Sequence, residues 1–161
     1  MHEPQELLVF SGVDKSFGRQ KALHDVSFTI SAGEFGALVG PARSGKTTIL
    51  RLSAGVDAPN HGSVFFEGSD IRDNGASALA RIGTVLGDTG LDRSRSVRSN
   101  LRFAADIYGV PARPAEARMD ALLARFSLTA NERDNVGSLG EIGQRLIAIA
   151  QAALHGPRLL L

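Results

Sequence analysis

An α/β fold is predicted for this 161-residue chain by three observations. Short apolar segments bounded by turn residues fill the first half, which is typical of strands. In the second half apolar residues recur every three or four positions, which is typical of helices. Between a predicted strand and a predicted helix lies a glycine-rich segment, residues 40–48. We therefore expect a β-rich first half and a helical subdomain at about residues 92–155.

The expected strands come mostly before residue 90. In one of them Val26, Phe28 and Ile30 alternate with polar residues, which predicts a strand with one buried face. The segment 35–39 is continuously apolar and predicts a buried strand. The full set of expected strands is 7–13, 26–30, 35–39, 63–68, 82–87 and one beginning at about 158.

Three helices are expected in the second half, in addition to one that begins at about residue 47. Ser96 is a suitable N-cap for the first of the three, and Pro114 suits the first turn of the second. Gly156 and Pro157 end the third. The apolar residues expected to face inward are Val97, Leu101, Ala104, Ala105 and Tyr108; Ala115, Met119, Leu122, Leu123 and Phe126; and Leu146, Ile149, Ala150, Ala153 and Leu154.

Composition excludes several classes of protein. The net charge is +1, which gives no reason to expect nucleic-acid binding. The absence of cysteine excludes disulfides and thiolate metal sites and is compatible with the cytosol. The acidic first residues do not resemble a signal peptide, and no apolar run is long enough to span a bilayer. A role at a membrane is therefore expected to require a partner.

The segment Gly40-Pro41-Ala42-Arg43-Ser44-Gly45-Lys46-Thr47-Thr48 fits the pattern of a phosphate-binding loop, G-x-x-x-x-G-K-[ST]. Its backbone N–H groups and the Lys46 ammonium would bind phosphates, and the Thr47 hydroxyl would ligate Mg²⁺. The expected helix after the loop would direct its N-terminus at the anion. The alternatives are a glycine-rich turn, a solvated lysine and a threonine that caps the helix.

Five further features agree in order and spacing with one family. They are the segment 25–34 before the loop, Phe17 about thirty residues before Lys46, the segment 99–103, and the segments 150–152 and 155–161. With these features the chain resembles the ATP-binding cassette (ABC) transporter ATPases from about Leu7 to Leu161. The segment 83–109 most resembles exporters of polysaccharides and related polymers.

The resemblance implies a fold and a set of ligands. The fold would be a P-loop NTPase core with an N-terminal antiparallel β subdomain and a helical insert, forming one partial nucleotide-binding domain over residues 1–161. ATP and Mg²⁺ are the implied cofactors. Phe17 would stack on the adenine, although packing at a strand edge is the alternative. The implied nucleotide-binding residues are Phe17, Gly40, Ser44, Gly45, Lys46, Thr47 (also the Mg²⁺ ligand) and Thr48.

The chain departs from the family pattern at several positions. Arg43 stands where the family commonly has glycine, which costs about 1–2 kcal/mol if φ is positive there. Gly87 stands where the family has glutamine; the adjacent Asp88 is either a water-mediated Mg²⁺ ligand or a turn residue. The family signature Leu-Ser-Gly-Gly aligns its serine with Gly140, or with Ser138 after a two-residue insertion. Its two glycines fall on Glu141 and Ile142 in the first alignment.

The family's acidic Asp-Glu pair and switch histidine have no counterparts up to Leu161, so catalytic residues are unknown and we expect a truncated domain. The resemblance implies an ATP-binding subunit that energises export through a transmembrane permease. It would pair with a second nucleotide-binding domain and lie in the cytoplasm, peripheral to the inner membrane. The alternatives are a catalytically inactive or regulatory module, a non-functional fragment, and an unrelated P-loop kinase or GTPase.

The basic stretch 92–98 also has two interpretations. It is either a solvated helix start or a contact with the membrane partner.

Overall fold

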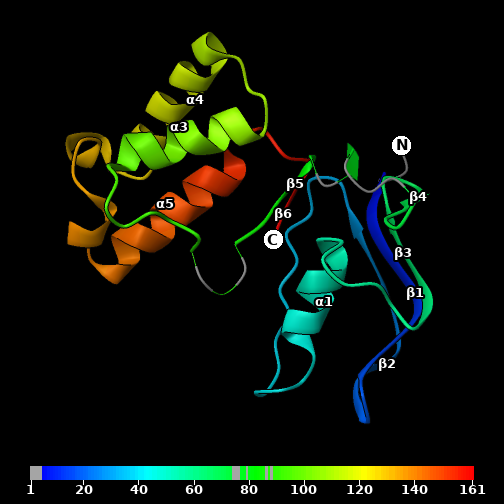
Figure 1. Cartoon of the computed structure of the whole chain (residues 1–161). Coiled ribbons are helices and arrows are strands. Elements are labelled where there is room, and N and C mark those ends of the chain that lie inside the picture. The colour runs from blue at the N-terminus through cyan, green and yellow to red at the C-terminus, as the bar shows by residue number, and fades with distance from the viewer. Residues whose placement is uncertain (1–4, 74–76, 79, 86, 88) are drawn as a thin grey trace. The chain divides into compact units, whose positions relative to one another are not determined.

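The computed structural model describes residues 5–73, 77, 78, 80–85, 87 and 89–161. The chain divides into two compact units, Met1–Leu79 and Ala80–Leu161, which are described separately below. Figure 1 shows most of the strands in the first unit and most of the helices in the second, as the sequence predicts.

The first unit is built on an antiparallel four-stranded sheet with the order β2-β1-β3-β4. Phe10 of β1 stacks on Phe28 of β2 with ring centroids 4.5 Å apart. The predicted strands at 7–13, 26–30 and 63–68 are confirmed; the first two are longer than predicted, and the third begins and ends two residues earlier. The strands are β1 (Glu6–Phe17), β2 (Gln20–Ser31), β3 (His61–Phe66) and β4 (Ser69–Asp70).

Helix α1 (Lys46–Ser53) follows the glycine-rich loop in this unit. It is anchored at its C-terminal end, where Leu52 is completely buried. The Arg51 guanidinium donates to both carboxylate oxygens of Asp57, at 2.7 and 3.0 Å. The helix is thereby fixed at its far end, which leaves its N-terminus directed toward the loop.

The prediction of a buried strand at 35–39 is wrong. These residues form no strand, and Phe35 and Val39 are 94% and 93% exposed. An apolar run becomes a buried strand only where neighbouring strands satisfy its backbone N–H and C=O groups. None of the described strands pairs with this segment.

The second unit is a small helical assembly with its own core. The three predicted helices are confirmed as α3 (Val97–Ile107), α4 (Ala112–Arg125) and α5 (Glu141–Ala153), and α4 begins two residues before Pro114. Two 3₁₀ turns, η1 (Thr129–Asn131) and η2 (Val136–Ser138), connect α4 to α5. The core is formed by Val97, Leu101, Ala104, Ala105, Ala115, Met119, Leu123, Leu128, Val136, Ile147, Ala150 and Leu154.

Two short parallel strands, β5 (Ile82–Gly83) and β6 (Leu159–Leu160), complete this unit. The predicted strand 82–87 is thus shorter than expected, although the Val85 N–H still donates to the Leu161 carbonyl at 2.8 Å beyond β5. A Cβ at Gly83 would lie 2.2 Å from the Ala152 carbonyl oxygen, so glycine allows β5 to approach the backbone of α5. In the described part of the chain, the helices are too short or too polar to cross a bilayer.

Candidate functional site

The glycine-rich loop closes against strand β2. Gly45 has φ of 90° and is the N-cap of α1. A Cβ at this position would lie 2.6 Å from the Leu23 Cδ2 and 2.8 Å from the Ala22 carbonyl oxygen. Glycine is therefore required here by both conformation and space, as the motif predicts.

Arg43 adopts a left-handed conformation in the same loop, with φ of 64°. The predicted penalty therefore applies, and a non-glycine residue in this conformation costs about 1–2 kcal/mol. Arg43 is exposed, and no ion pair holds its side chain among the described residues.

The Lys46 ammonium is folded back into the loop. Its Nζ donates to the carbonyl oxygens of Gly40 at 2.9 Å and Pro41 at 2.6 Å, and to Ser44 Oγ at 3.3 Å. The three hydrogens of the ammonium thus have three oxygen acceptors. A phosphate that enters the loop would offer charged oxygens in place of these neutral ones, and charge-assisted hydrogen bonds are the stronger kind.

The start of α1 leaves backbone donors available. The first hydrogen bond along the helix joins the Ile49 N–H to the Gly45 carbonyl at 2.9 Å. No side chain caps the helix. Among the described residues, the N–H groups of Lys46, Thr47 and Thr48 have no backbone acceptor, as is usual for a first helical turn. Unsatisfied N–H groups at a helix N-terminus are suited to anions.

These groups line a hollow of about 220 Å³ within the first unit. Phe17, which is distant in sequence, lies at the same hollow and is 49% exposed. Lys15 Nζ lies 5.1 Å from the centre of its ring. The residues that line the hollow are Phe17, Gln20, Ala22, Arg43, Ser44, Gly45, Lys46, Thr47 and Thr48.

The residues present fit a magnesium ion that is held jointly with phosphate. Thr47 lines the hollow, and the N-cap position before it is a glycine, which makes no side-chain capping bond. Among the described residues, no group of three or more His, Asp or Glu side chains is arranged to hold a metal. Mg²⁺ is commonly bound through few protein ligands together with substrate phosphates.

The N-terminus of α5 is the region where the family signature is expected. Gly140 is the N-cap of α5, whereas Ser138 lies in η2 and its hydroxyl donates to the Asn135 carbonyl at 2.7 Å. Glu141 occupies the first turn, and Ile142 is 79% exposed. Among the described residues, the start of α5 thus carries a carboxylate and no serine hydroxyl.

In the segment after β5, the described residues offer few side chains that could bind a nucleotide or a metal. Gly87 has φ of 62° and offers no side chain where the family pattern has glutamine. Its carbonyl accepts a hydrogen bond of 3.4 Å from the Arg145 guanidinium. Asp88, a possible Mg²⁺ ligand from sequence, lies outside the described residues.

A second hollow, of about 480 Å³, lies along α3 in the second unit, and we call it the arginine groove. Only the groove residues that come first in the sequence lie within the basic stretch 92–98. Phe103 and Arg133 lie outside that stretch, and the sequence did not predict them as part of the groove. The Val97 N–H donates to the Asp134 carbonyl at 3.0 Å, which brings the segment of Arg133 beside the start of α3. The groove is lined by Arg95, Ser96, Arg98, Ser99, Arg102, Phe103, Asp106, Glu132 and Arg133.

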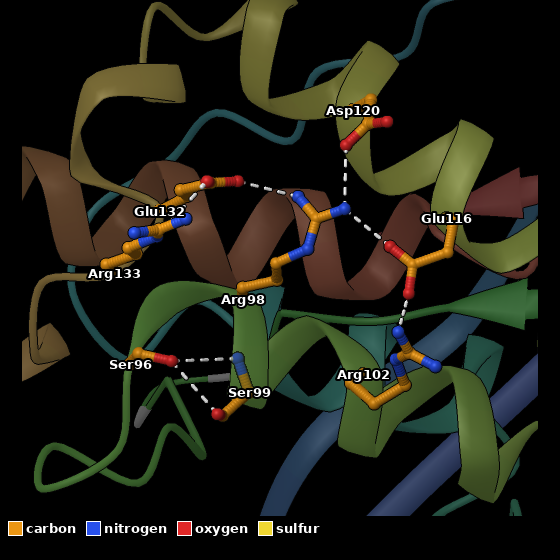
Figure 2. A network of polar contacts seen from close by, with 8 residues as sticks. All are labelled: Ser96, Arg98, Ser99, Arg102, Glu116, Asp120, Glu132 and Arg133. Carbon is orange, nitrogen blue, oxygen red and sulfur yellow. Dashed lines mark hydrogen bonds and ion pairs between the residues drawn. The ribbon is translucent and has the colours of Figure 1, made fainter.

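Figure 2 shows how acidic side chains hold part of this groove in place. Arg98 binds Glu116 and Asp120 of α4, at 2.5 and 2.9 Å, and Glu132 at 2.7 Å. Arg102 also binds Glu116. These four contacts tie α3 to α4 and to Glu132, the residue that follows η1. Arg98 and Arg102 are therefore held mainly by contacts within the second unit.

The loop before α3 is held by one buried amide. Asn100 is 4% exposed, and its Oδ1 accepts from the Asp92 N–H at 2.8 Å. Its Nδ2 donates to the carbonyls of Asp92 and Ser96, at 2.9 and 3.0 Å. Ser96 caps α3 as predicted, since its side chain accepts from the Ser99 N–H. These contacts fix the loop that carries Arg95.

The fold and the loop together define an α/β protein with a phosphate-binding loop in front of a helix. Comparison with known proteins is more specific: the family model described as ABC transporter matches residues 23–161. The chain belongs to the ABC transporter ATP-binding family.

Its relatives are ATP-binding proteins of import and export systems. The chain is 36% identical over 155 residues to the sulfate/thiosulfate import ATP-binding protein CysA 1 of Agrobacterium fabrum, covering 94% of this chain and 44% of the relative. It is 33% identical over 152 residues to the Nod factor export ATP-binding protein I of Burkholderia lata, covering 94% and 50%. The chain thus spans about half the length of these relatives, and their names assign it no direction of transport.

Solved structures agree with this fold. An ATP-binding subunit of an ABC transporter is similar with a TM-score of 0.85 and 25% identity, over 96% of this chain and 64% of that one. The structure of cbiO1 from Clostridium perfringens, described as part of the ABC transporter complex cbiONQ, has a TM-score of 0.86 at 23% identity, over 97% and 64%. The predicted P-loop NTPase core with its antiparallel β subdomain and helical insert is confirmed.

Proposed function

We propose that this chain is the nucleotide-binding part of an ABC transporter subunit and binds Mg·ATP at the loop 40–48. One observation carries the proposal: a single hollow brings Phe17 to the same place as Lys46, Thr47 and Thr48. An aromatic ring beside a phosphate-binding loop suits a ligand with a planar base and a polyphosphate.

Each residue has a distinct task in this proposal. Phe17 stacks on the adenine, and the backbone from Gly40 to Gly45 surrounds the phosphates. Lys46 neutralises phosphate charge, and Thr48 donates to the phosphate nearest the ribose. The Thr47 hydroxyl supplies one oxygen to Mg²⁺, which offsets the charge of the β- and γ-phosphates.

We expect turnover to be slow. Gly87 has no side chain to orient a water molecule. By the family resemblance, the start of α5 would face a nucleotide bound by a partner subunit, and Glu141 there would repel its phosphates. This carboxylate favours the second candidate function, a regulatory module that binds nucleotide without hydrolysing it. Phosphate release close to that of a protein-free control, with Mg·ATP bound, would support the regulatory module.

The decisive experiment is a calorimetric titration with Mg·ATP. Lys46→Ala removes the charge in the loop, and we expect it to weaken binding by about tenfold or more. Lys21→Ala is the matched control, because Lys21 is paired with Asp14 and does not line the hollow. Equal affinity for the wild type and Lys46→Ala, or no binding by the wild type, would contradict the proposal.

We further propose that a transmembrane permease contacts the arginine groove and that the subunit is held at the membrane in this way. Phe103 is 52% exposed, and the side chain of Arg133 is 93% exposed. Arg95 lies 5.9 Å from the Phe103 ring. An acidic helix or loop with one apolar side chain would match this combination.

A second nucleotide-binding domain is the other proposed partner.

A further inference from the structure

Arg43 combines two properties that are unusual in one residue. It holds a backbone conformation that disfavours side chains, and it lies at the hollow that contains Lys46. Residues kept in such conformations cluster at functional sites, where the side chain has a task. A glycine at this position would relieve the strain but would also remove a cation from the hollow.

The chemistry of the hollow indicates what that task is. Lys46 already has three oxygen acceptors within the loop. No ion pair holds Arg43 in the described residues, so its guanidinium is available to a ligand. A guanidinium presents a planar array of donors that matches phosphate oxygens, often with two hydrogen bonds at once.

We infer that Arg43 is a second phosphate-binding cation of this site and contacts the polyphosphate of the bound nucleotide. The inference rests on the proposed binding of Mg·ATP and goes beyond it, because the phosphate-loop motif assigns no such role to this position. It opposes the simpler expectation that an arginine at a glycine position only weakens the loop.

Three substitutions test whether the charge of Arg43 contributes to binding. Arg43→Gly removes both the charge and the strain, and Arg43→Asn removes the charge in a residue that tolerates a positive φ. Arg43→Lys keeps both the charge and the strain. Arg19→Asn is the matched control, because it removes an exposed arginine of the same unit that does not line the hollow.

The experiment is a titration of each full-chain variant with Mg·ATP, repeated with Mg²⁺ and inorganic tripolyphosphate and at two salt concentrations. We expect Arg43→Gly and Arg43→Asn to bind both probes roughly fivefold more weakly, whereas Arg43→Lys stays within about twofold and Arg19→Asn is unchanged. The two weakened variants should also lose part of the salt dependence, because one charge contact is missing.

The results distinguish this inference from the proposed function. Equal or tighter binding by Arg43→Gly, while Lys46→Ala loses binding, would overturn the role of Arg43 and leave the nucleotide site intact. A wild-type chain that binds neither probe would overturn both. A loss of ATP affinity without any loss of tripolyphosphate affinity would also overturn the inference, because the contact would then not be with phosphate.

Discussion

Lys46 shows how one side chain can organise a binding loop before the ligand arrives. Its ammonium donates to two carbonyls and a hydroxyl of the loop, so the positive charge is already placed inside the curve of the backbone. A lysine side chain that is already held in the loop would need little further ordering if phosphate oxygens replaced these acceptors.

At the residue scale, Asp70 makes stability depend on pH. The Arg72 guanidinium donates to both Asp70 oxygens, at 2.9 and 2.6 Å, and lowers the pKa of Asp70 to about 2. A carboxyl whose pKa is lowered in the folded state stabilises fully above its unfolded pKa, near 4. That contribution is lost as the pH falls from about 4 to about 2.

We expect Asp70→Asn to reduce this loss of unfolding free energy between pH 4 and pH 2. The variant and the wild type should differ in this loss by less than about 1 kcal/mol, because Arg72 is partly exposed and solvent screens the pair. Urea unfolding at a series of pH values measures it. Arg72→Gln should reduce the pH dependence in the same way; if it keeps the wild-type slope, the pair is not the cause.

At the scale of elements, helix α3 serves two purposes. Its buried face supplies Val97, Leu101, Ala104 and Ala105 to the core of the second unit. Its exposed side carries Phe103 and part of the arginine groove. Because Arg98 and Asn100 hold the helix and the preceding loop in place, exposed residues can be changed with little effect on folding.

The proposed contact with a permease is tested on this surface. We expect Phe103→Ser together with Arg133→Glu to reduce co-purification with the permease subunit of the same transporter from detergent extracts by about tenfold. The matched control is Arg113→Glu, an exposed change on α4 outside the groove. Unchanged recovery of the permease with an unchanged melting temperature would exclude the groove as its binding surface.

The elements also show what the sequence could predict. The loop motif named Lys46 and Thr47, and the family resemblance named Phe17; all three residues line one hollow. The strand expected at 35–39 failed because strand formation depends on neighbours, which periodicity does not reveal. Arg133 was missed because it meets α3 through backbone pairing of distant segments, which leaves no local pattern.

At the scale of the whole chain, two compact units each have a buried core. Val64 is completely buried in the first unit, and Met119 is completely buried in the second. Truncation of either side chain leaves a cavity, and only the neighbouring residues of the same unit can relax to fill it.

We expect Met119→Ala to destabilise the second unit by about 2 kcal/mol or more, and Val64→Ala to destabilise the first by a smaller amount. Hydrogen exchange followed by peptide mass analysis measures each unit separately. Faster exchange should be confined to residues 97–153 for Met119→Ala and to the strands of the first unit for Val64→Ala. An equal acceleration throughout the chain in both variants would show instead that the two units unfold as one.

The extended segment 35–39 has a practical consequence for work with the isolated chain. Phe35 and Val39 expose apolar side chains on a backbone that no described strand covers. Such a segment is a template for strand addition by a second molecule, which leads to aggregation at high concentration. Since it leads directly into the loop 40–48, molecules that associate through it would shield the nucleotide site that we propose at this loop. Dilute samples should therefore show a larger fraction of competent sites than concentrated ones.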